Sequence, residues 1–362
     1  MKKILLATTA LFALSGISVA AADVSLSGHV RYHYDSWSDE VVDADGSGNN
    51  NNSMGTDAEI WIKGNMVTDN GLTVAPEIRL NNLHDGSKPA SGRHYIKLSD
   101  DWGTLTLGRQ HSVGRTMSLD AEWRGTVSGG FEPVGANKTN VDDDLAVLSG
   151  DDLLADKGMQ LMTNSAIGAY AGPSAIIYQT PNISGFQAGV YFGDAGGTSK
   201  ANATDIALTY SLDAFSDGGV KVAYISNSVN AADNKATTKK FDNNQIGFEL
   251  NSGDFMASVN QTKKKGTPKS SGMTDKQTAQ ELELAYTASD SLTVNTVIFS
   301  SKVEEGASKN DKYKSTGVGA KYTIAPGLYA SLGYTTFTYT PDGAGAKKNK
   351  GNGMRLRVHA GF

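Results

Sequence analysis

The side chains able to perform chemistry are spread thinly along this chain of 362 residues. It contains no cysteine, which excludes disulfide bonds, thiolate zinc sites and a cysteine nucleophile. Its six histidines and numerous serines stand outside any recognisable nucleophile motif such as Gly-x-Ser-x-Gly. The sequence therefore predicts no catalytic residue and no cofactor.

Acidic residues offer one candidate metal site. Asp43-Ala44-Asp45-Gly46-Ser47 begins like a calcium-binding loop, but the third acid and the terminal glutamate of such a loop are missing. A hydrated loop is the favoured interpretation, and no metal site is predicted. Basic residues number 33 against 38 acidic ones, so no positive excess favours nucleic acid as a partner.

The first 22 residues have the features of a secretory signal peptide. Lys2 and Lys3 give a basic start, an apolar stretch runs from Ile4 to Leu14, and Ala20-Ala21-Ala22 forms a cleavage zone of small residues. We predict that residues 1–22 are removed on export. The remaining residues, 23–362, hold no apolar run of the roughly 18–20 residues that a membrane-spanning helix requires.

Alternation of apolar and polar residues dominates the rest of the chain. A period of two indicates a strand whose two faces meet different surroundings. We therefore predict an all-β chain. The segments with this pattern number sixteen: 24–34, 58–67, 72–80, 93–98, 104–109, 174–180, 186–193, 205–212, 220–227, 244–250, 255–261, 281–288, 292–300, 316–324, 328–337 and 354–362.

The connections between these segments alternate strictly in length. Short turns such as Thr68-Asp69-Asn70-Gly71 and Asn182-Ile183-Ser184-Gly185 follow the even-numbered strands. Long polar loops follow the odd-numbered strands, among them Asp35–Thr56 and the much longer Gln110–Pro173. This alternation puts all turns at one rim and all loops at the other, as in outer-membrane barrels. A barrel of 16 strands is too wide for side chains to fill, so we expect an aqueous interior.

Five stretches carry a family resemblance, and together they span the chain from residue 23 to its last residue. They are Asp23-Val24-Ser25-Leu26-Ser27-Gly28, Ile62-Lys63-Gly64 with Gly71-Leu72, Gly103-Thr104-Leu105-Thr106-Leu107-Gly108-Arg109-Gln110, Ser174-Ala175-Ile176-Ile177-Tyr178-Gln179-Thr180-Pro181 with Gly185-Phe186, and the terminal Phe362. In this order they resemble the general diffusion porins of Gram-negative outer membranes.

The resemblance implies a homotrimer of 16-stranded antiparallel transmembrane β-barrels with long extracellular loops and short periplasmic turns. A third loop, 110–173, would fold inward and constrict each channel. Ions and small hydrophilic solutes would diffuse through passively. Further implied partners are outer-membrane lipid, lipopolysaccharide and the outer-membrane assembly machinery, which would read the terminal aromatic residue, Phe362.

In this family, an acidic third loop faces a basic wall across the constriction, and the opposed charges orient dipolar solutes. Candidates for the basic wall share the inward register of the early strands: Arg31, Lys63, Arg79, Arg93 and Lys97. Arg109 matches the Gly-Arg motif of the family directly. Because Arg109 shares its register with outward Leu107, the strand must end or bend at Gly108 for Arg109 to enter the interior. The alternative for each residue is an inward polar side chain without a special role.

Two residues depart from the family pattern. His29 follows the first-strand glycine where some members have lysine, and Glu59 lies where they have arginine. A thinner basic wall is therefore expected, or one rebuilt from Arg31 and Arg79.

The third loop is rich in acids, with nine acidic residues against four basic ones. The candidates for the constriction are Asp120, Glu122, Glu132, Asp142, Asp143 and Asp144. An acidic throat attracts cations, so we expect a mild cation preference. The alternative is that much of this run is an exposed, solvated loop.

Two other functions are open at this stage. A substrate-specific outer-membrane channel would line its path with aromatic rings and paired charges; Trp61, Trp123 and Tyr95 could contribute, but the alternation shows no inward aromatic ladder. An outer-membrane barrel enzyme is the more remote alternative, because no nucleophile motif is present.

Overall fold

The computed structural model describes residues 23–42, 48–81, 90–119, 174–194, 201–231, 238–268, 275–305, 309–340, 342 and 348–362. The first half contains β1 (Asp23–Val42), β2 (Gly48–Val67), β3 (Thr73–Asn81), β4 (Ala90–Asp100), β5 (Gly103–Arg109), the short helix α2 (Val113–Thr116), β6 (Ala175–Gln179), β7 (Phe186–Asp194) and β8 (Ala201–Phe215). The second half contains β9 (Gly218–Ala231), β10 (Thr238–Ser252), β11 (Phe255–Pro268), β12 (Asp275–Ser289), β13 (Leu292–Glu305), β14 (Lys309–Ala325), β15 (Leu328–Thr340) and β16 (Asn349–Gly361).

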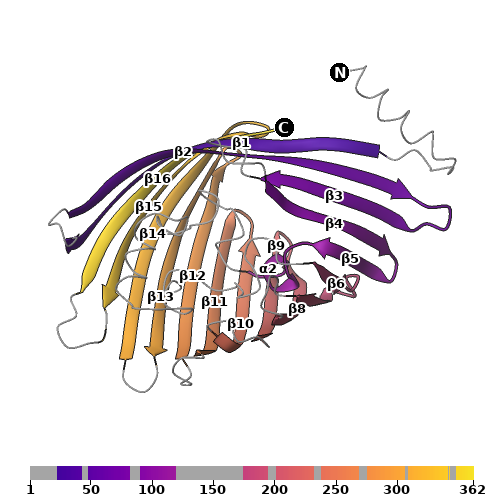
Figure 1. The fold of residues 1–362 in the computed structure, drawn as a ribbon. Helices are drawn as coiled ribbons and strands as arrows, with labels where there is room; N and C mark the ends of the chain where they lie inside the picture. Colours follow the sequence, from indigo (N-terminus) through magenta and orange to yellow (C-terminus); the bar gives the residue numbers. More distant parts are fainter. Residues whose placement is uncertain are drawn as a thin grey trace.

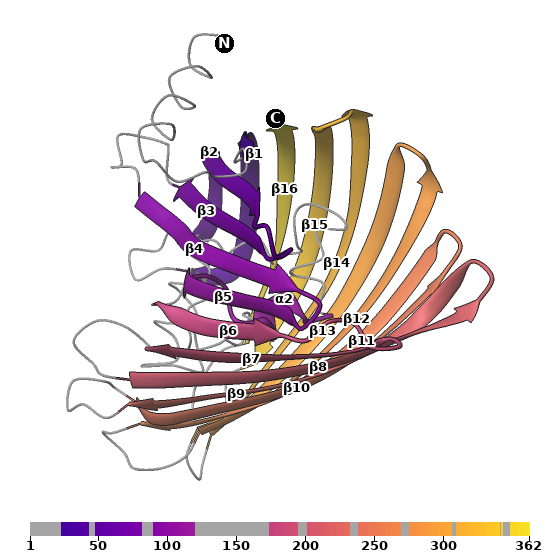
Figure 2. The ribbon, with the colours of Figure 1, turned by 90° about the vertical axis from the view of Figure 1, so that its right-hand side faces the viewer.

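The strands form one closed antiparallel barrel. Each strand pairs with its neighbours in sequence, and β1 also pairs with β16, so that the sheet has no free edge. Figures 1 and 2 show the yellow C-terminal strand β16 beside the indigo β1. The predicted antiparallel barrel of 16 strands is confirmed.

Burial along the strands is the reverse of that in a soluble protein. On β15 the small polar side chains of Ser331 and Thr335 are buried toward the interior, while Leu332 and Tyr334 are 47% and 44% exposed on the outer face. Successive side chains of a strand point to opposite faces. The outer face is therefore apolar and the inner face polar, as a barrel in lipid requires.

The short turns lie where the sequence predicts them, between even-numbered and odd-numbered strands. Gly71, Gly185 and Gly327 have positive φ values of 89°, 90° and 78° in the turns after β2, β6 and β14. Glycine adopts this conformation without the steric cost that a Cβ atom brings. The composition of these segments therefore determines the sharp reversals at this rim.

The barrel closes at the last residue of the chain. The backbone N–H of Gly28 donates to the carbonyl oxygen of Phe362 at 2.9 Å, and the N–H of Phe362 donates to the carbonyl of Gly28 at 3.0 Å. The ring of Phe362 stays 64% exposed. Phe362 thus lies at the seam between the first and last strands.

The first hairpin is longer than the alternation predicts. The segment 35–56 is expected to be a loop, but β1 continues to Val42 and β2 begins at Gly48, with Asp35 opposite Ser53 and Ser38 opposite Asn50. The sequence of these segments is polar at both parities. A strand whose two faces are both polar in sequence has no period-two pattern, so periodicity could not reveal this extension.

The connection between β5 and β6 is the longest within the barrel, since β5 ends at Arg109 and β6 begins at Ala175. Residues 110–119 of it are described, including α2, which lies against β7, β8 and β9 (Figure 1). Within the described ranges, no helix has the length and apolar character needed to cross a membrane.

Candidate functional site on the inner wall

Five of the six candidate basic residues share the inner face of four adjacent strands. The strand register places Lys63 opposite Glu77, Arg79 opposite Arg93, and Lys97 opposite Ala75. Arg31 lies opposite Asp57 on β2. The residues of the other parity, Ile62, Ile78 and Ile96, are 39–47% exposed on the outer face. Arg31, Lys63, Arg79, Arg93 and Lys97 therefore form one basic patch, the basic wall.

Arg109 has a different register. It pairs with His94 on β4, in the same phase as the outward pair Ile96 and Leu107. Gly108 before it has a φ of 129°, which marks a local distortion of the strand. The strand register therefore does not bring Arg109 into the basic wall.

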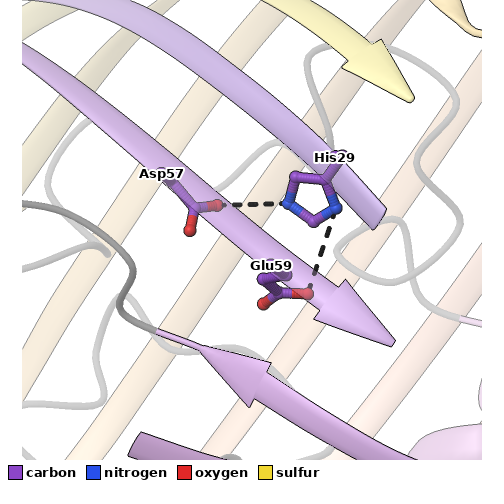
Figure 3. Close-up of side chains that lie close together, drawn as sticks. All are labelled: His29, Asp57 and Glu59. Atoms are coloured by element: carbon purple, nitrogen blue, oxygen red, sulfur yellow. Dashed lines mark hydrogen bonds and ion pairs between the residues drawn. The ribbon is translucent and has the colours of Figure 1, made fainter. Parts of the chain in front are cut away.

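The two departures from the family pattern, His29 and Glu59, are direct cross-strand partners on β1 and β2. With Asp57 they form the His29 cluster (Figure 3). Nε2 of His29 is 3.5 Å from Oδ2 of Asp57, and Nδ1 is 4.0 Å from Oε2 of Glu59. The histidine is only 2% exposed, so its ring lies against the wall between the two carboxylates.

The same carboxylate oxygens bind arginines of the basic wall. Nη1 of Arg31 is 3.3 Å from Oδ2 of Asp57, and Nη2 of Arg79 forms an ion pair with Oε2 of Glu59. Nε1 of Trp61 also donates to Oε2 of Glu59, at 3.2 Å. One histidine and two carboxylates within 4.8 Å of one another resemble a divalent-cation site. The guanidinium groups already neutralise the two oxygens, so we assign the cluster to a salt-bridge network of the wall.

A second buried ion pair joins the ends of the chain. Nε of Arg355 on β16 donates to Oδ1 of Asp35 on β1 at 2.6 Å, and Nη2 donates to Oδ2 at 2.8 Å. Both side chains are at most 5% exposed. This bidentate pair bridges the closing seam from inside the barrel.

Sequence reasoning missed the acidic residues on the opposite side of the barrel. Glu281 and Glu283 on β12 and Asp205 on β8 are buried toward the interior, and Glu249 on β10 shares the inward register of Gln245. The signal was present in the sequence, because Glu281-x-Glu283 alternates with outward Leu282 and Leu284. The third-loop acids Asp120, Glu122, Glu132, Asp142, Asp143 and Asp144 lie outside the described residues, as does the segment 43–47.

The start of the third loop is seated on the wall by apolar packing. Val113 and Met117 on and beside α2 are 0% and 4% exposed, and they pack in one cluster with Ile177, Tyr191 and Ile225 from β6, β7 and β9. Such burial of apolar side chains stabilises by about 1.5–3 kcal/mol each. The helix is therefore held against the wall in the same way as a core element of a soluble protein.

His111 lies just before α2 in the sequence, and its side chain is neutral. Burial, together with the positive charges of Arg115 and Arg79, lowers the pKa of His111 to about 3. Nδ1 of the ring therefore accepts a hydrogen bond from Nη1 of Arg115 at 3.1 Å. Of these two residues at the start of the third loop, only Arg115 therefore carries a charge.

We predict that Gly189→Leu reduces the single-channel conductance. A Cβ atom at Gly189 on β7 would lie 2.8 Å from Sδ of Met117 and 2.9 Å from Cγ1 of Val113, so the seat has no room for a side chain. The added bulk pushes α2 off the wall and toward the barrel axis. Ala188→Leu, which adds bulk on the outer face, is the matched control. Equal conductance of the two variants in planar bilayers would contradict this account of the seat.

Comparison with known proteins connects this geometry to one family. A family model described as Gram-negative porin matches residues 7–342. The anion-selective porin from Comamonas acidovorans is similar in structure, with a TM-score of 0.69 at 15% identity over 94% of this chain and 100% of that chain. No curated protein sequence matches the chain.

Two further solved structures are similar. The outer membrane channel DcaP of Acinetobacter baumannii has a TM-score of 0.64 at 12% identity, covering 95% of this chain and 98% of that one. The trimer form of OmpT, an outer membrane protein of Vibrio cholerae, has a TM-score of 0.63 at 15% identity, covering 94% and 99%. At identities this low, the structural similarity shows a shared barrel fold and nothing more specific.

Proposed function

The chain belongs to the Gram-negative porin family, and we propose that the outer-membrane channel it forms sorts solutes by size and by the opposed charges of its inner wall. Membership of the family makes it a barrel of the outer membrane through which ions and small hydrophilic solutes diffuse passively. What we propose beyond family membership is the physical basis on which the channel discriminates between solutes. It rests on the described side chains of the barrel interior.

The observation that carries the proposal is an uneven distribution of charge around the barrel. Arg31, Lys63, Arg79, Arg93 and Lys97 lie on β1 to β4 beside the inward acids Asp35, Asp57, Glu59 and Glu77. The inward acids Asp205, Glu249, Glu281 and Glu283 lie on β8 to β12, where the described inward cations are Lys221 and Lys264. Strands this far apart in the order of the barrel face each other across the interior. Opposed charges in a narrow aqueous throat produce a transverse field that orients dipolar solutes and impedes apolar ones.

For the whole channel we propose a mild cation preference, to which the acids of residues 110–173 contribute. This segment would be the constriction loop, residues 1–22 a cleaved signal peptide and residues 23–362 the barrel. Reversal potentials in a salt gradient test the preference. A clear anion preference would contradict it.

The contribution of the basic wall is tested by charge reversal. We predict that Lys63→Glu with Lys97→Glu raises the ratio of cation to anion permeability severalfold, because two accessible positive charges of the interior become negative. Lys302→Glu is the control, since Lys302 lies near the loop end of β13, 45% exposed and paired with Glu304. If the reversal potential shifts equally for both variants, the inner wall does not determine selectivity.

The proposal extends to the oligomeric state of the channel and to its partners in the outer membrane. We propose a homotrimer, which the trimer form of the similar OmpT of Vibrio cholerae supports. We propose further that lipid and lipopolysaccharide contact the outer surface, and that the assembly machinery reads Phe362. The exposure of the Phe362 ring at the barrel seam supports the last point, because an exposed terminal aromatic side chain is accessible to a receptor.

We also propose that the channel catalyses no reaction. Two of its interior histidines serve structural contacts: His29 lies between Asp57 and Glu59, and His359 accepts a hydrogen bond from Nε of Arg31 at 3.1 Å. Esterase and protease assays of the detergent-solubilised protein test this directly. Turnover that survives purification to homogeneity would overturn it.

The alternative, a substrate-specific channel, makes a different prediction for neutral solutes. An unspecific channel gives liposome swelling rates that do not saturate and that fall smoothly with solute size. A preferred sugar that swells liposomes faster than smaller sugars would favour the alternative.

A further inference from the structure

Four aromatic rings form a continuous row across the inner wall. We define the ring row as Tyr329 on β15, His359 on β16, His29 on β1 and Trp61 on β2. The rings of Tyr329 and His359 stack at 4.5 Å, those of His359 and His29 at 5.1 Å, and Trp61 meets His29 edge-on at 6.0 Å. These are the separations and orientations at which aromatic rings attract one another.

Positive charges lie over both ends of the ring row. Nζ of Lys321 is 5.8 Å from the ring centroid of Tyr329, and Nζ of Lys63 is 4.9 Å from that of Trp61. Arg79 lies 5.2 Å from the same Trp61 ring. Among the described residues, neither Lys63 nor Lys321 forms an ion pair with a carboxylate. Both lysines are therefore available to an anion that arrives from the interior.

The row remains accessible. Tyr329, His359, Trp61, Lys63 and Lys321 are all partly exposed, whereas His29 is buried between its neighbours. A planar solute can thus meet ring edges and faces at both ends of the row. A carboxylate on that solute can pair with the lysine that lies over the same ring.

We propose that the ring row is a weak binding subsite for small aromatic carboxylates that pass through the channel. The proposal rests on the proposed function of the chain as a diffusion channel. An aromatic anion satisfies both features of the site at once, because its ring packs on aromatic faces while its charge pairs with the lysines.

Other solute classes fit the row less well. A cationic solute is repelled by Lys63, Arg79 and Lys321. A sugar needs hydroxyl acceptors, but the nearest carboxylates, Asp57 and Glu59, already bind Arg31 and Arg79. The chemistry of the row therefore selects an anion with a ring over a neutral polyol.

The experiment measures block of KCl conductance in planar bilayers by benzoate, acetate and glucose. We expect benzoate to block saturably in the millimolar range, with a half-saturating concentration at least tenfold below that of acetate. Tyr329→Leu, Trp61→Leu and Lys321→Gln should each raise the benzoate value severalfold. Tyr322→Leu is the matched ring control, since Tyr322 neighbours Lys321 on β14 but is 54% exposed on the outer face.

The outcomes separate the subsite from the channel. Equal block by benzoate and acetate, block by glucose as strong as that by benzoate, or unchanged benzoate block in both Tyr329→Leu and Trp61→Leu would overturn the subsite. Unblocked KCl conductance reports the channel itself, so its absence in the unmodified protein would speak against the proposed function instead. Each variant is compared only after its own KCl conductance is measured. If Trp61→Leu does not insert, Tyr329→Leu and Lys321→Gln decide the question.

Discussion

Replacing Asp35 with alanine should lower the free energy of unfolding of the barrel by about 3–5 kcal/mol. Asp35 holds the guanidinium of Arg355 through two hydrogen bonds of 2.6 and 2.8 Å, and both residues are buried. Without the carboxylate, Arg355 keeps a buried charge next to Arg357, another nearly buried cation two residues away on β16. The loss falls on the seam between β1 and β16, where the barrel closes.

Urea unfolding in lipid vesicles, followed by tryptophan fluorescence, measures this loss. The double variant Asp35→Ala, Arg355→Met should recover most of it, because an apolar side chain of similar length replaces the buried charge that has lost Asp35. Asp69→Ala, which removes an exposed acid from the turn after β2, should change little. An Asp35→Ala variant as stable as Asp69→Ala would show that the ion pair does not stabilise the seam.

The second large effect is expected for Gly185→Ala, at about 2–5 kcal/mol. A left-handed conformation costs an L-residue about 1–2 kcal/mol, and overpacking adds about 1–3 kcal/mol. Gly185 has a φ of 90°, and a Cβ atom there would overlap the carbonyl oxygen of Ser211 on β8. That carbonyl belongs to a strand of the sheet, so it cannot move aside without breaking the ladder.

Gly71→Ala is the matched control for this prediction. Gly71 has almost the same φ, 89°, but no described atom lies within 4 Å of a Cβ atom placed there. Only the conformational cost of about 1–2 kcal/mol should appear. Urea unfolding of the two variants side by side separates strain from crowding, and equal losses would mean that the overlap is relieved at no cost.

The barrel could be predicted because its physics is local. Alternation within a strand reports two different surroundings, and turn residues such as Gly71 and Gly185 report sharp reversals within a few positions. The extension of the first hairpin beyond Tyr34 could not be predicted, because a segment that is polar at both parities has no alternation to detect.

The inner wall was predictable only in part. Arg31, Lys63, Arg79, Arg93 and Lys97 share one face because alternate residues of a strand point to the same side of the sheet, and this could be read from the sequence. The partners of these residues depend on how neighbouring strands pair, and the alternation along a single strand gives no information about that pairing. His29 and Glu59 therefore looked like two separate losses of positive charge, although they are one cross-strand pair.

The ring row illustrates the same limit. The alternation along each strand shows no ladder of inward aromatic residues, because each strand contributes one ring to the row. The row runs perpendicular to the strands, from Tyr329 through His359 and His29 to Trp61, and becomes visible only when the register of β15, β16, β1 and β2 is known.

From the seam between Gly28 and Phe362 we expect an order of folding. Every other strand pair joins strands that are consecutive in sequence, and all of these except β5 with β6 can form from a short stretch of chain. The pairing of β1 with β16 joins opposite ends, with His29 opposite Gly361, and its loop-closure entropy is the largest in the molecule. Closure is therefore expected to come late, after both β1 and β16 are available to pair. Until then the chain presents two open sheet edges, each a template for pairing with another chain.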